Sequence, residues 1–388
     1  IVFGDIGTSV LYVFTAITGG RNFDPELVYG SVSCVIWTLI LIATIKYIYF
    51  ALNADNQGEG GIFALYALLR RKKAKWIIYP ALIGCAALLS DGFITPAISI
   101  SSAVEGLNHI YPSLPIIPIV CIIILILFAF QQFGTNVIGR FFGPVMVVWF
   151  LLIGSIGLVQ LAKDATILAA LNPMYALTFL IDYPNAIWVL GAVFLCTTGA
   201  EALYSDLGHC GRKNIRISWA FVFCMLLLNY LGQASYCLNL PAGYTTDSIF
   251  YDMMPKGFLM PAICIATMAT VIASQALLTG IFTLVNEAIK LRLWTNLRVK
   301  YPSTHKGQIY IPFINGVLLA GCLTVVFIFQ KSSNMEAAYG LAITLNMLVT
   351  TILLGYLLYV QYKRYKALVS VFVLLYLIIE GVFLYSNF

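Results

Sequence analysis

Three carboxylic acids lie inside long apolar runs of the sequence. Asp5 is in GDIGTSVLYV, Asp91 is in CAALLSDGFITPAIS and Glu201 is in FLCTTGAEALYSD. In a run that crosses a membrane, each acid costs roughly 3 kcal/mol or more if it is charged and unpaired at mid-bilayer. Such groups need a compensating positive charge, which protons, metal cations or basic side chains can supply.

Basic side chains that could compensate the three acids are scarce. Lys46 is the only Lys or Arg more than a few residues from the end of an apolar run, and its place about two turns from that end predicts that its ammonium extends to the membrane surface. One ammonium cannot balance three carboxylates. Most of the missing charge must therefore come from outside the protein, as protons or metal cations. Permanent protonation with a hydrogen bond between helices is the alternative for any single acid.

Oxygen-bearing side chains follow the first acid at helical spacing. They stand at positions i + 3, i + 4 and i + 7 from Asp5, which share one face of a helix. These residues are Thr8, Ser9 and Tyr12. The two glycines of GDIG weaken a helix and favour its unwinding, and unwound backbone at membrane depth lines cavities. The first run therefore predicts an interrupted helix whose oxygens face a cation.

The other two acids have similar neighbours. Thr95 lies one turn after Asp91, and the proline that follows has no N–H, which frees the carbonyl of Gly92. Thr198 and Glu201 lie at i and i + 3 in TTGAE. Hard cations prefer oxygen ligands of this kind, and the ligands of soft metals are absent here. The secondary candidates, whose hydroxyls serve helix packing equally well, are Thr8, Ser9 and Thr197.

The composition indicates an all-α, polytopic membrane protein. Hydrophobic residues make up 61% of the chain and charged residues 10%, whereas a soluble domain carries about a quarter charged residues. Runs of roughly 18 or more mostly apolar residues predict eleven membrane-spanning helices within one transmembrane domain, residues 1–388. The runs cover residues 1–19, 28–53, 76–106, 114–133, 144–163, 186–208, 214–236, 257–289, 310–329, 337–360 and 367–387.

The positive charges predict the orientation of these spans. Most Lys and Arg residues of the connections follow the even-numbered runs, so we expect those connections and the N-terminal end to be cytoplasmic. We also expect a twelfth span and a cytosolic region after the last residue. A short apolar stretch at 61–72 with a basic end predicts a helix at the cytoplasmic interface. The net charge of +6 is thus a topology signal and not a nucleic-acid-binding patch.

The predicted interruptions have a positional pattern. The first and sixth runs occupy corresponding positions if the chain contains two inverted halves of five spans. The approximate halves are residues 1–163 and 186–360, and 367–387 is an additional span. In transporters built this way, the substrate lies between the two interrupted helices. The pattern predicts a carrier for a small cation.

Four stretches resemble the KUP/HAK/KT family of potassium transporters. They are GDIGTSVLYV at 4–13, ADNQGEGGIFALYALLRR at 54–71, SDGFITPAISISSAVEGL at 90–107 and AAYGLAIT at 337–344. They follow one another in family order, and GEGGIFALYALLRR is most similar to bacterial KimA-type members. Val10 stands where the family pattern GTSPLY has proline.

The resemblance implies a LeuT-like fold of the amino acid–polyamine–organocation (APC) superfamily. It also implies high-affinity potassium uptake by proton symport across the bacterial cytoplasmic membrane, with alternating access around the interrupted helices and no cofactor. A homodimer that forms through a C-terminal region, and control by cyclic di-AMP, are further implications.

The matching motifs also carry over site residues. The resemblance implies that one acid of this cluster carries the proton. We assign the proton to Glu201 and expect K⁺ itself at Asp5, Asp91 and Thr198. The full set of implied potassium-binding residues is Asp5, Tyr12, Asp91, Thr95 and Thr198.

Two other functions fit a polytopic carrier. The first is a proton-coupled amino-acid transporter of the same fold, although three acids would repel a substrate carboxylate. The second is a potassium channel or uniporter, although the sequence lacks a TVGYG-type filter. No nucleophile–base pair, metal motif or phosphate loop indicates an enzyme.

Overall fold

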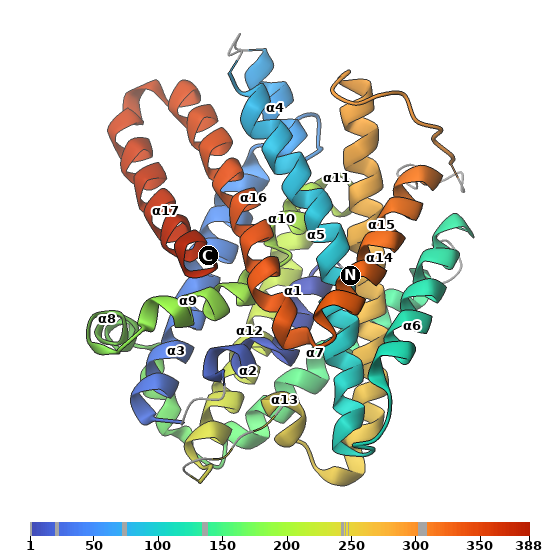
Figure 1. Cartoon of the computed structure of the whole chain (residues 1–388). Helices are drawn as coiled ribbons and strands as arrows, with labels where there is room; N and C mark the ends of the chain where they lie inside the picture. The colour runs from blue at the N-terminus through green and yellow to red at the C-terminus, as the bar shows by residue number, and fades with distance from the viewer. Residues whose placement is uncertain are drawn as a thin grey trace.

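The part of the chain that the structure describes folds mainly into helices, as the composition predicts. The computed structural model describes residues 2–19, 23–71, 76–133, 139–241, 244, 246, 248–301 and 309–388. Figure 1 shows long helices grouped around a centre made of shorter ones, α1 and α10. Extended pairing among the described residues is limited to two isolated bridges in connections.

Nine helices of the described chain are long and apolar enough to cross a membrane. Each coincides with one of the predicted runs. In chain order they are α3 with its π-helical continuation (Pro25–Asn53), α5 with a closing turn (Ile78–His109), α7 (Gly139–Leu161), α9 with α10 (Ala186–Ser205), α12 (Arg212–Leu238), α14 with an opening turn (Lys256–Lys290), α15 (Pro312–Phe329), α16 (Ser332–Gln361) and α17 (Lys366–Ser386).

The other two predicted runs are also helical but shorter. The fourth run is α6, a single apolar helix of 15 residues (Ile116–Phe130). The first run is divided into α1 (Gly4–Thr8), a 3-10 turn (Ser9–Leu11) and α2 (Val13–Thr18). Neither reaches the length of a full span by itself, so the structure supports nine spanning helices where eleven were expected.

A bent pair of helices occupies a segment that the sequence analysis assigned to a connection. The 3-10 helix Ala165–Leu171 and α8 (Pro173–Asp182) meet at an angle of 80°. The bend has a local cause, because Asn172 accepts a hydrogen bond from the Met174 N–H and proline follows at the first helical position. Counted as one broken span, this pair would raise the number of crossings to ten.

The predicted helix at 61–72 is present as α4 (Ile62–Arg70). It packs against α5 and α16, and its apolar side chains, Leu65 and Leu69 among them, are buried. The basic residues Lys72, Lys73 and Lys75 lie outside the described residues. The position of α4 at a membrane surface stays a prediction.

The first interruption lies one turn later than the glycines predicted. Gly4 and Gly7 are inside α1, and the helix is interrupted after Thr8. A Cβ at Gly4 would stand 2.8 Å from Ala273 of α14, and one at Gly7 would stand 2.6 Å from Phe150 of α7. These glycines therefore allow close helix packing and do not unwind the segment.

The sixth-run interruption lies at the predicted residues. There α9 (Ala186–Phe194) ends in a 3-10 turn, and α10 (Ala200–Ser205) begins after Thr198 and Gly199. Thr198 is extended, with φ −54° and ψ 141°, and Gly199 has φ +83°, a conformation that favours glycine. The chain thus leaves the helix for two residues in the middle of the molecule.

Helices α7 and α12 meet without intervening side chains. A Cβ at Gly232 of α12 would stand 2.4 Å from the Cα of Gly157 on α7. Beside this contact, the Asn229 side chain donates to the Ile153 carbonyl at 2.9 Å. Small residues at helix interfaces allow such approach in membranes.

We expect Gly232→Ala to destabilise the full-length protein, because the methyl group would meet backbone atoms of α7 that cannot rotate away. Overpacking of this kind costs about 1–3 kcal/mol. The measurement is the midpoint of thermal unfolding in detergent, with Gly316→Ala of α15 as the control, since a Cβ at Gly316 meets nothing within 4 Å. Equal midpoints for the two variants would contradict the assigned α7–α12 contact.

Candidate cation site

Asp5 is buried where three elements meet. Its carboxylate, 5% exposed, accepts hydrogen bonds from the Tyr339 hydroxyl of α16 at 3.2 and 3.0 Å. On the opposite side, a Cβ at Gly199 would stand 2.8 Å from the Asp5 Cβ. The absence of a side chain at Gly199 thus lets the sixth-run interruption approach the first acid.

Asp91 and Thr95 lie on α5 and contact each other. Thr95 donates to the Asp91 carboxylate, which is 6% exposed and also experiences Coulombic repulsion from Asp5. The helix runs on through the proline, so the expected free carbonyl of Gly92 needs a partner. It finds one in the Cys322 thiol of α15, at 3.5 Å. The carbonyl thus has a partner within the protein, and its role as a cation ligand stays a prediction.

A hydroxyl pair joins the two interruptions. Ser9 Oγ and Thr198 Oγ1 lie 2.5 Å apart, although the residues are far apart in sequence. The Tyr12 hydroxyl donates to Ser9 Oγ at 3.3 Å. The structure thus brings together the side chains that the sequence analysis selected from the first and sixth runs.

Two of the secondary candidates use their hydroxyls locally. Thr8 donates to the Asp5 carbonyl at 3.0 Å, and Thr197 donates to the Phe194 carbonyl at 2.8 Å. Both bonds support the last turn of a short helix that has few bonds of its own. Both contacts are local, within one segment, and a role for either hydroxyl as a cation ligand stays a prediction.

Glu201 has different neighbours from the two aspartates. It lies on α10, 4% exposed, and accepts hydrogen bonds from the hydroxyls of Tyr47 and Thr350, the latter at 3.0 Å. Tyr47 belongs to the π-helix Leu39–Phe50 that continues α3. The three predicted acids thus fall into two places, one with Asp5 and Asp91 and one with Glu201.

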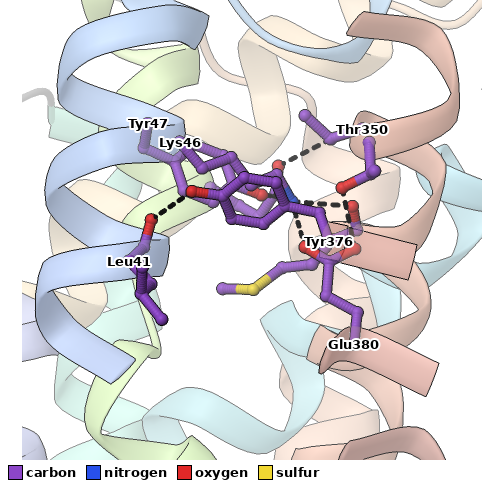
Figure 2. A network of polar contacts seen from close by, with 9 residues as sticks. Leu41, Lys46, Tyr47, Thr350, Tyr376 and Glu380 are labelled. Atoms are coloured by element: carbon purple, nitrogen blue, oxygen red, sulfur yellow. Dashed lines mark hydrogen bonds and ion pairs between the residues drawn. The ribbon is translucent and has the colours of Figure 1, made fainter. Parts of the chain in front are cut away.

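Lys46 does not extend to the surface, and that prediction is wrong. Its ammonium is 1% exposed and forms an ion pair of 2.5 Å with Glu380 of α17, which is fully buried. Figure 2 shows the two side chains pointing toward each other between the π-helix and the last two helices. The pair forms because a fourth acid, which the sequence analysis did not count among the deep ones, reaches the lysine.

Several contact residues escaped the sequence analysis. Glu380 could have been predicted, because it is an acid inside the apolar run YLIIEGVF. Tyr339 could also have been noticed, because it lies in the motif AAYGLAIT. Tyr47 and Thr350 carried no such signal, because a single tyrosine or threonine in a membrane helix is ordinary. Their roles depend on which helices become neighbours.

A cavity of about 330 Å³ lies beside the site. Tyr12 and Ser102 line it, together with Glu105 and Glu336 near the outer ends predicted for α5 and α16. The orphan hydroxyl of Ser248, buried and without a hydrogen-bond partner, lines it as well. The cavity is therefore polar where it meets Tyr12.

The electrostatics of the site follow from these contacts. Within the described residues, the ion pairs found do not include Asp5, Asp91 or Glu201. Lys46 is already engaged by Glu380 and cannot neutralise a second acid directly. The donors around the acids are hydroxyls, and no group of three His, Cys, Asp or Glu side chains in this part of the chain forms a transition-metal site. Such a site suits protons and hard monovalent cations.

Comparison of the sequence with known proteins identifies the family of this chain. The family model described as "K+ potassium transporter integral membrane domain" matches residues 1–388. Among curated relatives, a "Probable potassium transport system protein Kup" of Flavobacterium psychrophilum is 53% identical over the whole of this chain, and one of Enterococcus faecalis is 48% identical. The chain spans about 60% of the length of each of these relatives.

These matches confirm the resemblance to the KUP/HAK/KT family, whose members are transporters and not enzymes. The relatives named above are called Kup, so the particular similarity of GEGGIFALYALLRR to KimA-type members stays a prediction. A model that matches every residue of the chain, together with relatives at about half identity, leaves one conclusion: this chain belongs to the family of potassium transporter integral membrane domains.

Proposed function

We propose that the full-length protein takes up potassium by symport with protons. The observation that carries this proposal is the set of three buried carboxylates without an ion-pair partner among the described residues, while Lys46 is engaged by Glu380. Two kinds of positive charge from outside can fill two separate places. The family membership and the names of the relatives favour K⁺ as the first of them.

Potassium would bind at Asp5 and Asp91, with Tyr12, Thr95 and Thr198 supplying further oxygens. The two carboxylates repel each other when both are charged, and a cation between them removes that repulsion. The hydrogen bonds that Tyr339 and Thr95 donate hold the carboxylates in place without neutralising them. A cation without strict geometric demands fits such a set of hydroxyls and carboxylates.

The proton would bind at Glu201. Its partners Tyr47 and Thr350 are hydroxyls, and it lies apart from the two aspartates. Glu201 is three residues after Thr198, so a change in the sixth-run interruption would reach both places at once. This shared segment offers a physical link between the bound cation and the bound proton.

Alternating access would occur around the two interrupted segments. The interruptions support two inverted halves, residues 1–163 and 186–360, with 367–387 as an additional span in a LeuT-like, APC-type fold. In this scheme the Ser9–Thr198 hydrogen bond closes the contact between halves, and the cavity at Tyr12 is the outer entrance. The N-terminal end would be cytoplasmic and the membrane the bacterial cytoplasmic one.

Proton coupling meets an energetic need. An inside-negative potential supplies about 2.3 kcal/mol per charge for each 100 mV, so potassium alone accumulates only until this driving force is balanced. A co-transported proton adds a second charge and any pH gradient, which permits high-affinity uptake from dilute medium. Dimerisation through a C-terminal region and control by cyclic di-AMP remain predictions from the family resemblance.

The first prediction concerns Glu201→Gln. In proteoliposomes that hold the full-length protein, with the voltage clamped near zero, an inward proton gradient should drive uphill uptake of rubidium, a potassium surrogate. The variant should lose this dependence because glutamine cannot carry the proton. The measurement is the initial rate of rubidium uptake with and without the gradient.

Other outcomes distinguish the rival functions. Uptake by the wild type that ignores the proton gradient would contradict symport and indicate a uniporter or channel. Uptake of neutral amino acids driven by the proton gradient, with no rubidium transport by the folded protein, would favour the amino-acid carrier of the same fold.

A second prediction tests the close approach of the two interruptions. Gly199→Ala should abolish rubidium uptake, because the new methyl group would displace Asp5 and strain the backbone at φ +83°. Gly211→Ala is the matched control, since Gly211 also has positive φ, at +76°, but a Cβ there meets nothing within 4 Å. Similar uptake by the two variants would show that contact with Asp5 is unimportant.

A further inference from the structure

The ion pair between Lys46 and Glu380 has a large cost and no evident structural need. Both side chains are removed from water, and the ammonium also donates to the Met347 carbonyl at 2.9 Å. Buried ion pairs contribute little net stability compared with apolar residues of similar size, whereas the loss of one partner costs about 3–5 kcal/mol. The position of the pair next to the proposed proton site suggests another use.

Two pairs of consecutive residues connect this ion pair to Glu201. On the π-helix, Lys46 bonds Glu380 and Tyr47 bonds Glu201. On α16, Thr351 bonds Glu380 at 2.7 Å and Thr350 bonds Glu201 at 3.0 Å. The two carboxylates are therefore held by consecutive residues of the same two helices, in a network of polar contacts that spans four segments of the chain.

The π-helix is the local device that makes this arrangement possible. Its wider turn rotates successive side chains by a smaller angle than an α-helix does. Consecutive residues such as Lys46 and Tyr47 can therefore bond two acids that lie near each other. Tyr376 of α17 donates to the Leu41 carbonyl at 2.8 Å, which ties the last helix to the same segment, as Figure 2 shows. Such π-helical segments occur frequently at functional sites.

Charge counting assigns a role to each group. The Lys46 ammonium and the two carboxyl groups, Glu201 and Glu380, have no net charge when one of the two carboxyl groups is protonated. Because Glu380 is paired with Lys46, that proton belongs to Glu201. When it leaves, the network has a net charge of −1, and the ammonium is the positive charge that acts on the new carboxylate. The titratable groups that face Glu201 in the described chain are Lys46 and Tyr47 of the π-helix, Glu380 of α17 and Tyr204 of α10 itself.

We propose that Lys46 and Glu380 are the positioning residues of proton coupling: the ammonium stabilises Glu201 after its proton has passed to water, and Glu380 holds the ammonium beside it. This inference rests on the proposed symport, in which Glu201 carries the proton. No bond other than the O–H bond of the Glu201 carboxyl breaks. Neither residue contacts potassium.

Single substitutions should move the pH profile of uptake in opposite directions. Lys46→Met removes the charge that favours proton release, so the profile of proton-driven rubidium uptake should shift to higher pH. Glu380→Gln leaves the ammonium unpaired beside Glu201, so the profile should shift to lower pH and uptake should lose much of its dependence on the proton gradient. Each shift should reach about one pH unit, the usual spread that neighbouring charges cause.

The control and the double variant keep the test decisive. Arg212→Met breaks another ion pair, that of Arg212 with Asp55 at 2.6 Å, and should leave the profile unchanged. If the single variants do not fold, the double variant Lys46→Met/Glu380→Gln removes both charges of the ion pair, leaves neither partner unpaired and should fold. Because the ammonium that the proposal assigns to the Glu201 carboxylate is missing from the double variant, its pH profile of uptake should still shift to higher pH.

Folded single or double variants with the wild-type pH profile and gradient dependence would overturn the proposal and leave the pair a structural role. A wild type whose rubidium uptake ignores the proton gradient would instead refute the proposed symport itself. Comparison with Glu201→Gln under the same conditions separates the two failures, since that variant reports the absence of the proton carrier directly.

Discussion

The cost of burying a carboxylate governs the arrangement of this molecule. Among the residues that the structure describes, four acids are buried, and their partners differ in how far they replace the lost hydration. Glu380 has an ammonium, whereas Asp5, Asp91 and Glu201 have only hydroxyl donors. Hydrogen bonds orient a carboxylate but do not cancel its charge. In the proposed function, the three acids receive cations from outside the protein, and the lack of an internal positive charge beside them is the physical basis of that proposal.

Irregular backbone is concentrated where these acids are held. The first segment changes from α1 to a 3-10 turn beside Asp5, the sixth leaves the helix at Thr198 and Gly199, and α3 becomes π-helical around Lys46. Backbone of this kind is tolerated at membrane depth only inside protein or along a cavity. The regular helices α5, α14 and α16 surround these segments and supply a stable frame. Each of these three segments that depart from α-helical geometry thus holds or adjoins a buried charged side chain.

Sequence reasoning predicted properties that depend on neighbouring residues along the chain. Apolar runs predicted the positions of the helices, and TTGAE predicted the sixth interruption, because local composition decides both. The same reasoning failed for Lys46, whose partner is 334 positions away, and it did not foresee the thiol of another helix that donates to the Gly92 carbonyl. It also placed the first interruption at GDIG, although those glycines serve contacts with α7 and α14. Pairings between distant helices are set by packing, which a single sequence does not display.

The contact of Gly157 with Gly232 has a mechanical consequence. It joins α7, in the first proposed half, to α12, in the second, with backbone against backbone and no flexible side chain between them. A close backbone contact of this kind favours rotation of one proposed half against the other about this point. If the halves rotate about these two glycines, the displacement of a residue grows with its distance from them. The largest openings would arise far from the joint, while the helices at the joint itself would scarcely separate.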